Sequence, residues 1–192
     1  MVNNPTKYNQ WDVLRAFLII GQSPMRLSRV VLSERLELGE GAMRSVLDLL
    51  KRQKLLSATQ RGHALTAKGE WSFREMTKRV SIPKMVKFSE YPQLVNVAIV
   101  LRKCGDKPVG THERDLAVRE GAEGVMLLTH TGKLTVPGFR YGKPFSEIEA
   151  QLDATEGDLV IIAFAKQRRI AENAMLWIAA EIVPRAFPKA LC

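Results

Sequence analysis

The sequence predicts an α+β protein with two domains, because charge and periodicity both change near its middle. Residues 1–88 contain 16 Lys and Arg against 7 Asp and Glu, a net charge of +9, whereas residues 89–192 contain 13 of each. Apolar residues recur at helical spacing in the first part, and strand-length apolar runs alternate with helical segments in the second. All of the excess positive charge therefore belongs to the N-terminal domain, which suits a polyanionic partner such as nucleic acid or an anionic membrane surface.

Composition excludes several classes of protein. Hydrophobic residues make up 46% and charged residues 26% of the chain, which is typical of globular proteins and too apolar for general disorder. No apolar run reaches the roughly 18 residues that span a bilayer, and the first ten residues lack the layout of a secretion signal. With only Cys104 and Cys192 present, we expect neither a disulfide framework nor a clustered metal site. The expected location is the cytoplasm.

Apolar spacing indicates the first two helices. Residues 11–20 are rich in apolar side chains and are followed by Gly21, a residue suited to helix C-termini, so we predict a buried core helix. A second helix is predicted over residues 28–37, with Val30 turned inward. The Gly-Glu-Gly run at residues 39–41 then predicts a tight turn.

Residues 42–54 have the clearest helical pattern in the sequence. On a period of 3.6 residues, apolar side chains fall on one face of this segment and polar side chains on the other. The apolar face holds Met43, Val46, Leu47 and Leu50, and the polar face holds Arg44, Ser45, Asp48 and Arg52. One face is expected to pack, which leaves the other to contact a partner.

A short hairpin and a fourth helix complete this domain. Residues 55–59 and 64–66 predict two strands joined by a four-residue polar turn, residues 60–63, in which glycine supplies a positive φ. Thr66 is suited to cap a fourth helix over residues 67–80. The order helix, helix, turn, helix, hairpin, helix is that of a winged helix-turn-helix.

The second domain is predicted to be a small α/β domain with a mixed sheet. Residues 81–92 contain two prolines and no clear period, and we interpret them as the linker between domains at 1–80 and 93–192. Strands and helices then alternate roughly as βαββαβα. The predicted strands are residues 94–101, 124–128, 134–136 and 158–165, and the predicted helices are residues 111–120, 144–152 and 168–183.

The polar face of residues 42–54 has the chemistry of a helix that reads double-stranded DNA. The major groove is about 12 Å wide and accepts one helix, and an arginine such as Arg44 can contact guanine in bidentate fashion. Basic residues at the helix end and on the wing suit the flanking phosphates. The predicted DNA-contacting residues are Arg44, Ser45, Asp48, Lys51, Arg52, Lys54, Gln60, Arg61 and His63.

Two side chains near this face have alternative roles. His63 touches phosphate or simply occupies an exposed turn. Glu40 complements the helix dipole, the role we favour, or accepts a hydrogen bond from a cytosine amine.

Three stretches resemble known proteins: residues 38–47 (LGEGAMRSVL), 49–56 (LLKRQKLL) and 61–69 (RGHALTAKG). They resemble the recognition helix and wing of prokaryotic winged-helix transcription regulators, and LTAKG at residues 65–69 is similar to their wing-to-helix junction. As a whole, the chain resembles an archaeal family of winged-helix regulators whose C-terminal domain has no established function. The resemblance implies DNA binding, although winged helices also serve as protein-interaction modules.

The function that the sequence favours is a transcription regulator, a homodimer that binds DNA in a sequence-specific way. Its neutral C-terminal domain is expected to bind a small-molecule effector, with loops 103–110 and 166–169 as rims of a pocket. The last predicted helix carries an apolar stripe that covers its own sheet or forms a dimer seam. We assign no catalytic residue, metal ligand or cofactor. The alternatives are a metabolite enzyme with an appended winged helix and an adaptor that binds RNA or protein.

Overall fold

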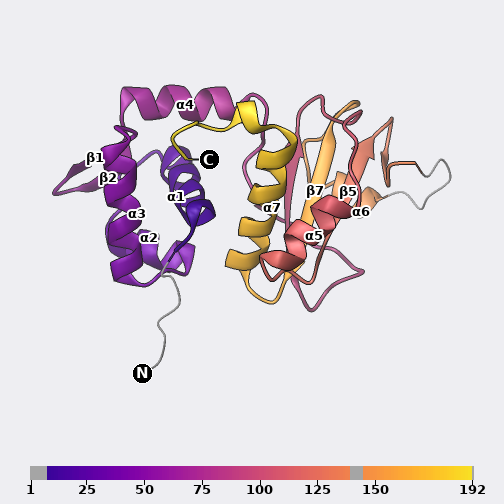
Figure 1. The fold of residues 1–192 in the computed structure, drawn as a ribbon, viewed down its shortest axis with the longest axis horizontal. Helices are drawn as coiled ribbons and strands as arrows, with labels where there is room; N and C mark the ends of the chain where they lie inside the picture. Colours follow the sequence, from indigo (N-terminus) through magenta and orange to yellow (C-terminus); the bar gives the residue numbers. More distant parts are fainter. Residues whose placement is uncertain (1–7, 139–144, 192) are drawn as a thin grey trace. The chain divides into compact units, whose positions relative to one another are not determined.

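The chain forms two compact units in a computed structural model that describes residues 8–138 and 145–191. Unit 1 comprises Met1–Met76 and Phe187–Cys192, and unit 2 comprises Thr77–Ala186. Figure 1 shows helices α1 to α4 of unit 1 and the larger sheet of unit 2. The α+β class is confirmed. Within the described residues, none of the helices combines the length and hydropathy needed to span a bilayer.

Unit 1 contains the elements that its periodicity predicts, in the same order. They are α1 (Gln10–Gln22), α2 (Arg29–Leu36), α3 (Glu40–Arg52), β1 (Leu56–Thr59), β2 (Gly62–Leu65) and α4 (Ala67–Thr77). Several details differ from the prediction. Residues 39–41 do not form a tight turn, because α3 begins at Glu40, and α4 ends at Thr77 and not at residue 80. Gly21 lies inside α1, where a Cβ would come within 2.4 Å of the Phe73 ring. Val30 is 52% exposed, because Leu32 and Leu36 form the buried face of α2 instead.

Helix α1 carries a buried ion pair that its apolar pattern does not reveal. The Asn9 side chain accepts hydrogen bonds from the backbone of Trp11 and Asp12, and the Asp12 carboxylate accepts one from the Asn9 backbone. Arg15 Nη1 donates to Asp12 at 3.1 Å and to the Leu36 carbonyl at 3.0 Å. Both charged side chains are buried, which proteins tolerate when the charges are paired and hydrogen-bonded. Arg15 thereby ties α1 to the C-terminal end of α2.

The hairpin of β1 and β2 is tighter than predicted. Thr59 pairs with Gly62, so the turn contains only residues 60–61, and His63 lies within β2. Gly62 has a φ of +114°, and a Cβ at this position would come within 2.7 Å of the Leu27 carbonyl oxygen. Leu27 and His63 exchange backbone hydrogen bonds of 3.0 and 2.8 Å. Glycine is needed here both for the conformation and for this close approach.

Unit 2 follows the predicted order of strands and helices. Its elements are β3 (Lys84–Met85), β4 (Val95–Leu101), α5 (Thr111–Arg119), β5 (Gly124–His130), β6 (Leu134–Thr135), α6 (Ser146–Glu149), β7 (Leu159–Ala165), α7 (Arg168–Ile182) and the 3-10 helix η1 (Pro184–Ala186). The strands form one sheet in the order β3-β4-β7-β5-β6. From β4 onward, the βαββαβα alternation is as predicted.

Two predictions about this unit need correction. Residues 81–92 are not a linker, because β3 pairs with β4 and because Val86 and Phe88 are buried. The sheet also differs from the predicted mixed one, since every pairing between described strands is antiparallel. Strands β4 and β5 do run in the same direction, but β7 lies between them and is antiparallel to both. Alternation of strands and helices indicates direction without specifying which strands become neighbours.

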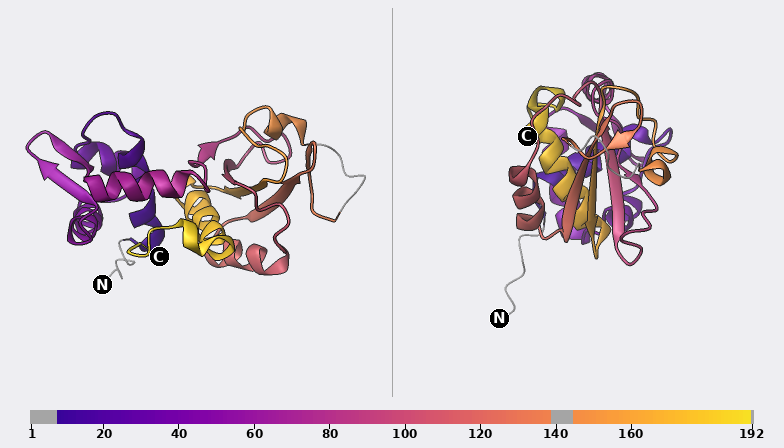
Figure 2. Two further views of the ribbon diagram at one scale, coloured as in Figure 1. Left: turned by 90° about the horizontal axis from the view of Figure 1, so that it is seen from above. Right: turned by 90° about the vertical axis from the view of Figure 1, so that its right-hand side faces the viewer.

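Helices cover both faces of the unit 2 sheet (Figure 2, right-hand view). Helix α7 packs on β4 and β7, with α5 beside it. On the opposite face, Ile148 of α6 joins an apolar cluster formed with Val86, Phe88, Ala98, Val100, Leu128, Leu134, Val160 and Ile162. Helix α7 therefore covers its own sheet, the first of the two roles that its apolar stripe suggested.

Candidate nucleic-acid interface

Helix α3 packs on α1 and α2 through one face and exposes the other. Its buried side chains are Ala42, Met43, Val46, Leu47 and Leu50, as the helical period predicts apart from Ala42, a small residue beside the apolar stripe. The helix ends in a Schellman motif, in which Leu55 N–H donates to the Leu50 carbonyl at 3.0 Å and Lys54 N–H donates to that of Lys51 at 2.8 Å. Lys54 adopts the left-handed conformation that this motif requires, with φ at +59°. The packing of the buried face and the capped C-terminus fix the orientation of α3, and with it the position of its exposed side chains.

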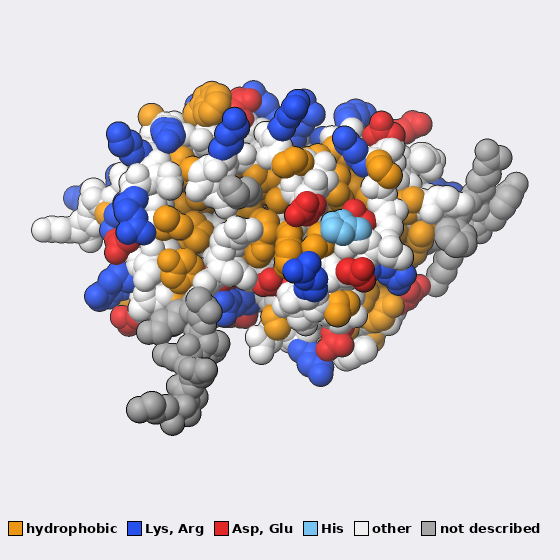
Figure 3. Space-filling view, in the orientation of Figure 1, with side chains coloured by type: hydrophobic (Ala, Val, Ile, Leu, Met, Phe, Trp, Pro, Cys, Tyr) orange, Lys and Arg blue, Asp and Glu red, His pale blue; other side chains and the backbone are white. Residues whose placement is uncertain are grey.

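The exposed face of α3 brings five of the predicted residues together. Arg44, Ser45, Asp48, Lys51 and Arg52 are all exposed, and at 100° per residue they share an arc of roughly 120°. Figure 3 shows Lys and Arg side chains gathered along the margin of unit 1 at α3 and α4. The sequence pattern thus located this exposed face correctly, because the period that places the apolar side chains on one side of a helix also places the polar ones on the other.

The side chains of this face differ in whether their polar groups already form a hydrogen bond or ion pair within the protein. Ser45 Oγ donates to the Gly41 carbonyl at 3.1 Å, and Lys51 Nζ lies 3.3 Å from the Asp48 carboxylate. Within residues 8–138 and 145–191, no hydrogen bond or ion pair engages the guanidinium groups of Arg44 and Arg52. These two arginines are consequently the groups of α3 most ready to bind an external anion.

The LTAKG stretch fastens the end of α3 to the start of α4. Thr66 Oγ1 donates to the Lys54 carbonyl at 2.7 Å and accepts from the Gly69 backbone at 3.1 Å, so it caps α4 as predicted. Lys68 Nζ donates to the Gln53 carbonyl at 3.0 Å. A Cβ on Gly69 would come within 2.2 Å of a backbone oxygen of the segment that follows α3, which explains the glycine. Residues 65–69 therefore have a structural role, since their hydrogen bonds join the C-terminus of α3 to the N-terminus of α4.

The hairpin adds two more predicted residues to the exposed set. Gln60 and Arg61 form the two-residue turn between β1 and β2, and both are exposed. The Arg61 backbone N–H donates to Thr59 Oγ1 at 3.2 Å, which holds the turn, while its side chain extends into solvent. Lys54 is likewise exposed, just beyond the end of α3. These side chains are free to meet a large partner, such as a duplex, that contacts α3.

His63 has a structural setting. The ring is partly buried, and Nδ1 lies 3.2 Å from the Leu27 carbonyl oxygen. Burial is the main cause that lowers the pKa of His63, and the backbone hydrogen bond opposes it. The charges of Lys51, Arg29 and Arg26 lower this pKa further. Since His63 lies in β2 with its ring on Leu27, the exposed-turn role is corrected, and the ring fastens the hairpin to the segment before α2.

Two basic residues beside this histidine were not assigned from the sequence. Arg26 Nη1 donates to the Gly62 carbonyl at 3.5 Å, and Arg29 Nη2 lies 3.4 Å from the Glu40 carboxylate. Arg26 precedes α2 and Arg29 is its first residue, and the sequence pattern placed neither in the DNA-contacting set. Their basic character was the available signal, and only the fold brings both near His63. Glu40 lies in the first turn of α3, as its favoured dipole role requires, and is paired with Arg29.

The thiol of Cys104 in unit 2 is not exposed to solvent. Cys104 is buried, its Sγ donates to the Arg102 carbonyl at 3.2 Å, and burial raises its pKa, all of which make the thiol inert. Cys192 lies outside the described residues. Among the residues that the structure describes, no group of three or more His, Cys, Asp and Glu side chains is placed to hold a metal ion.

Comparisons with known proteins match both halves of the chain. Residues 12–71 match the family described as PH0730-like, N-terminal domain, and residues 93–182 match a domain of unknown function, DUF4443. The solved structure of hypothetical protein PH0730 from Pyrococcus horikoshii OT3 is 26% identical, with a TM-score of 0.79 over 96% of this chain and 97% of that one. The chain is similar to an archaeal protein over nearly its full length. No curated protein matches it.

Proposed function

We propose that unit 1 is a winged helix-turn-helix that binds double-stranded DNA, and that the protein regulates transcription. In this proposal α3 enters the major groove, and the β1–β2 hairpin is the wing that follows the flanking backbone. The observation that carries it is the exposed face of α3, where Arg44 and Arg52 have no partner among the described residues. Net charge supports it, since unit 1 carries +6 and unit 2 carries +3; residues 77–88, with a net charge of +4, belong to unit 2.

The side chains divide into those that read bases and those that hold phosphates. Arg44 stands in the first half of α3, where a recognition helix meets base edges, and its guanidinium suits the two acceptors of guanine. Arg52, Lys54 and Arg61 lie at the helix end and the hairpin turn, where they suit flanking phosphates. Asp48 neutralises Lys51 in the free protein, and this exposed pair is weak enough to open on binding.

Glycine near the start of α3 gives independent support. Gly41 lies in the first turn, its φ is not in the left-handed region, and a Cβ there would meet nothing within 4 Å. A helical glycine costs about 1 kcal/mol of stability relative to alanine, and neither packing nor backbone conformation requires it here. Close approach of a DNA phosphate to the helix N-terminus would require it.

A homodimer is part of the proposal. One recognition helix contacts few base pairs, and a two-fold pair reads both halves of a palindrome. Unit 2 would pair the two copies or bind an effector, and its net charge of +3 is lower than the +6 of unit 1.

Selection of bound duplexes from a random library, followed by salt titration, tests the proposal. We expect affinity of the full chain for the selected site to fall linearly in log salt, with a slope of several units. Arg44→Ala should weaken the selected site by about 1–3 kcal/mol, and Arg52→Ala should weaken all duplexes and reduce the slope by about one. Arg185→Ala, an exposed arginine of unit 2, is the matched control. Salt-insensitive binding, or tighter binding of RNA, would overturn the proposal.

A further inference from the structure

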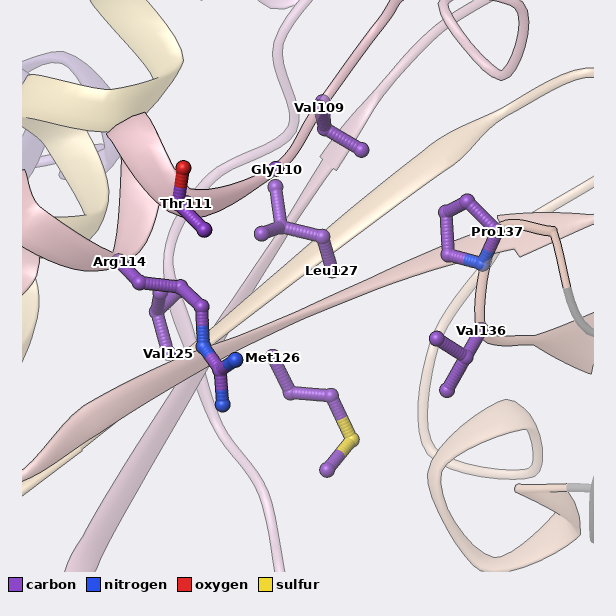
Figure 4. A pocket seen from close by; sticks show the side chains of 9 residues that line it. All are labelled: Val109, Gly110, Thr111, Arg114, Val125, Met126, Leu127, Val136 and Pro137. Carbon is purple, nitrogen blue, oxygen red and sulfur yellow. The ribbon is translucent and has the colours of Figure 1, made fainter.

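Unit 2 contains a cavity of about 350 Å³ beside the start of α5. Its walls come from the segment before α5, from α5 itself, from β5 and from the residues after β6, and they include Val109, Thr111, Arg114, Met126, Val136 and Pro137. Figure 4 shows the Arg114 side chain reaching from α5 toward Met126, with Val136 and Pro137 across the opening. Only the first of the two predicted pocket rims, residues 103–110, contributes, since residues 166–169 do not line the cavity.

The cavity follows a stretch of β5 that has a neighbour on one side only. Residues 124–129 of β5 pair with β7, whereas β6 pairs only with Thr129 and His130. Among the described residues, no strand covers the other edge of residues 124–128. This unpaired edge leaves room for a bound molecule. Val125, Met126 and Leu127 point alternately to the two faces of the sheet and line the cavity with apolar side chains on both sides of the edge.

Among the described residues, Arg114 is the only charged side chain of the lining, and Thr111 contributes a hydroxyl beside otherwise apolar side chains. No described residue forms a hydrogen bond or ion pair with the Arg114 guanidinium. The nearby Glu113 carboxylate already accepts a hydrogen bond from the Gly110 backbone N–H at 2.7 Å, so the start of α5 is capped by a residue of the helix itself. Arg114 is therefore the group that recognises an anion, and the valine, leucine, methionine and proline side chains receive an apolar body.

We propose that this cavity binds a small organic anion, a carboxylate with an apolar body, whose charge pairs with Arg114. The volume lies at the lower end of the roughly 300–1,000 Å³ found for ligand pockets, which suits a metabolite rather than a nucleotide or a peptide. As a binding site it stands apart from the proposed DNA binding. As an effector site it rests on that proposed function.

Calorimetric titration of the full chain with octanoate and with octanamide tests the site without DNA. The two probes share an apolar tail and differ in charge. We expect octanoate to bind one to one and about ten- to a hundred-fold more tightly than octanamide, as a charge-assisted hydrogen bond provides. Acetate, which lacks the tail, should bind much more weakly than octanoate.

Variants assign the effect to the guanidinium. Arg114→Gln should reduce octanoate binding to the level of octanamide, whereas Arg185→Gln, another exposed arginine of unit 2, should leave it unchanged. Arg114 is exposed, so the variant should retain the thermal stability of the parent. Equal binding of the two probes, absence of saturable octanoate binding, or full binding by the Arg114→Gln chain would overturn the proposal.

The effector role is measured separately, by DNA affinity with and without saturating octanoate. A change of about five-fold or more would establish coupling between the units. DNA binding that ignores octanoate would remove the effector role and leave the ligand site standing. Loss of all DNA binding would remove the proposed function and would not affect the calorimetric result.

Discussion

Helices α3 and α7 are both amphipathic in sequence, yet they have different surroundings. Helix α3 buries Ala42, Met43, Val46, Leu47 and Leu50 and exposes its basic face. Helix α7 buries Ala171, Glu172, Asn173, Ala174, Met175, Leu176, Ile178, Ala179 and Ala180, which surround most of its circumference. An amphipathic pattern alone therefore does not mark a binding helix, and the helix to test for a partner is the one whose polar face stays exposed.

Within the described residues, both units contain paired and unpaired arginines, and the two kinds serve different purposes. In unit 1, Arg44 and Arg52 remain without partners among the described residues. In unit 2, Arg102 lies 2.8 Å from Asp158, and Arg168 lies 2.7 Å from Glu172. Charges that pair within a unit hold its fold, whereas unpaired cations on one face remain available for an external anion.

Introducing a glutamate into each helix should give the largest difference in stability between α3 and α7. We expect Ala174→Glu in α7 to lower the free energy of unfolding by at least about 3 kcal/mol, because it buries a carboxylate without a partner. Ser45→Glu in α3 should change it by less than about 0.5 kcal/mol and weaken DNA binding instead. Urea unfolding of both variants measures this, and equal destabilisation would show that α3 has no free face.

Acid unfolding tests whether unit 2 depends on its internal charges. Burial alone would raise the pKa of Asp158, but hydrogen bonds from the backbones of Lys103 and Thr155 and from Arg102 hold it below its ordinary value. The folded state thus favours the carboxylate. Its stabilisation is present above the unfolded pKa, about 3.9 for aspartate, and is lost as pH falls through the lower folded value.

Asp158→Asn should therefore cost about 1–3 kcal/mol at pH 7 and should flatten the pH dependence of unfolding below about pH 4. Asp153→Asn is the control, since that side chain is 96% exposed and its ion pair with Arg102 should contribute little. Thermal melts between pH 2 and pH 7 compare the three proteins. An unchanged acid limb in the Asp158→Asn protein would refute the assignment.

Gly41→Ala tests whether the glycine at the start of α3 serves DNA binding at the expense of stability. With open space around the position, alanine should raise the free energy of unfolding by about 0.5–1 kcal/mol. DNA affinity should fall several-fold, because the methyl group would obstruct a phosphate at the helix N-terminus. Denaturation and DNA titration of the same preparation separate the two effects. A variant that is more stable but binds DNA with unchanged affinity would show that no DNA phosphate lies close to Gly41.

The smallest effect is expected for Asp48→Asn. Removing this carboxylate frees Lys51, so affinity for non-specific duplex should rise a few-fold and the salt slope should steepen by up to about one. Stability should change by less than about 0.5 kcal/mol, as for other exposed pairs. Asp115→Asn, on the exposed side of α5 in unit 2, serves as the control, and its DNA binding should equal that of the parent.

Local patterns predicted much of this molecule because each depends on neighbours in sequence. The period of residues 42–54 located the exposed face of α3, and Thr66 caps α4 as its type and position indicated. The alternation of strands and helices in unit 2 was predictable because strand and helix periods differ. Of the candidate site, the residues of α3 and the hairpin turn were found in this way.

Contacts between distant residues had no comparable signal. The apolar pattern of residues 11–20 gave Arg15 no role, yet it is buried against Asp12 and the Leu36 carbonyl. His63 looked like a turn residue until its pairing with Leu27, 36 positions away, placed it in a strand. Such roles depend on which segments meet, and residue types alone do not specify this.

The sequence by itself determined the order of elements from α1 to α4 and from β4 to α7, the two faces of α3 and the concentration of positive charge in residues 1–88, because these follow from residue type and local period. The tertiary structure decided that β7 separates β4 from β5, that Arg44 and Arg52 stay unpaired within the described residues, and that a cavity opens along β5. Those properties arise from packing between segments far apart in the chain, which no local period encodes.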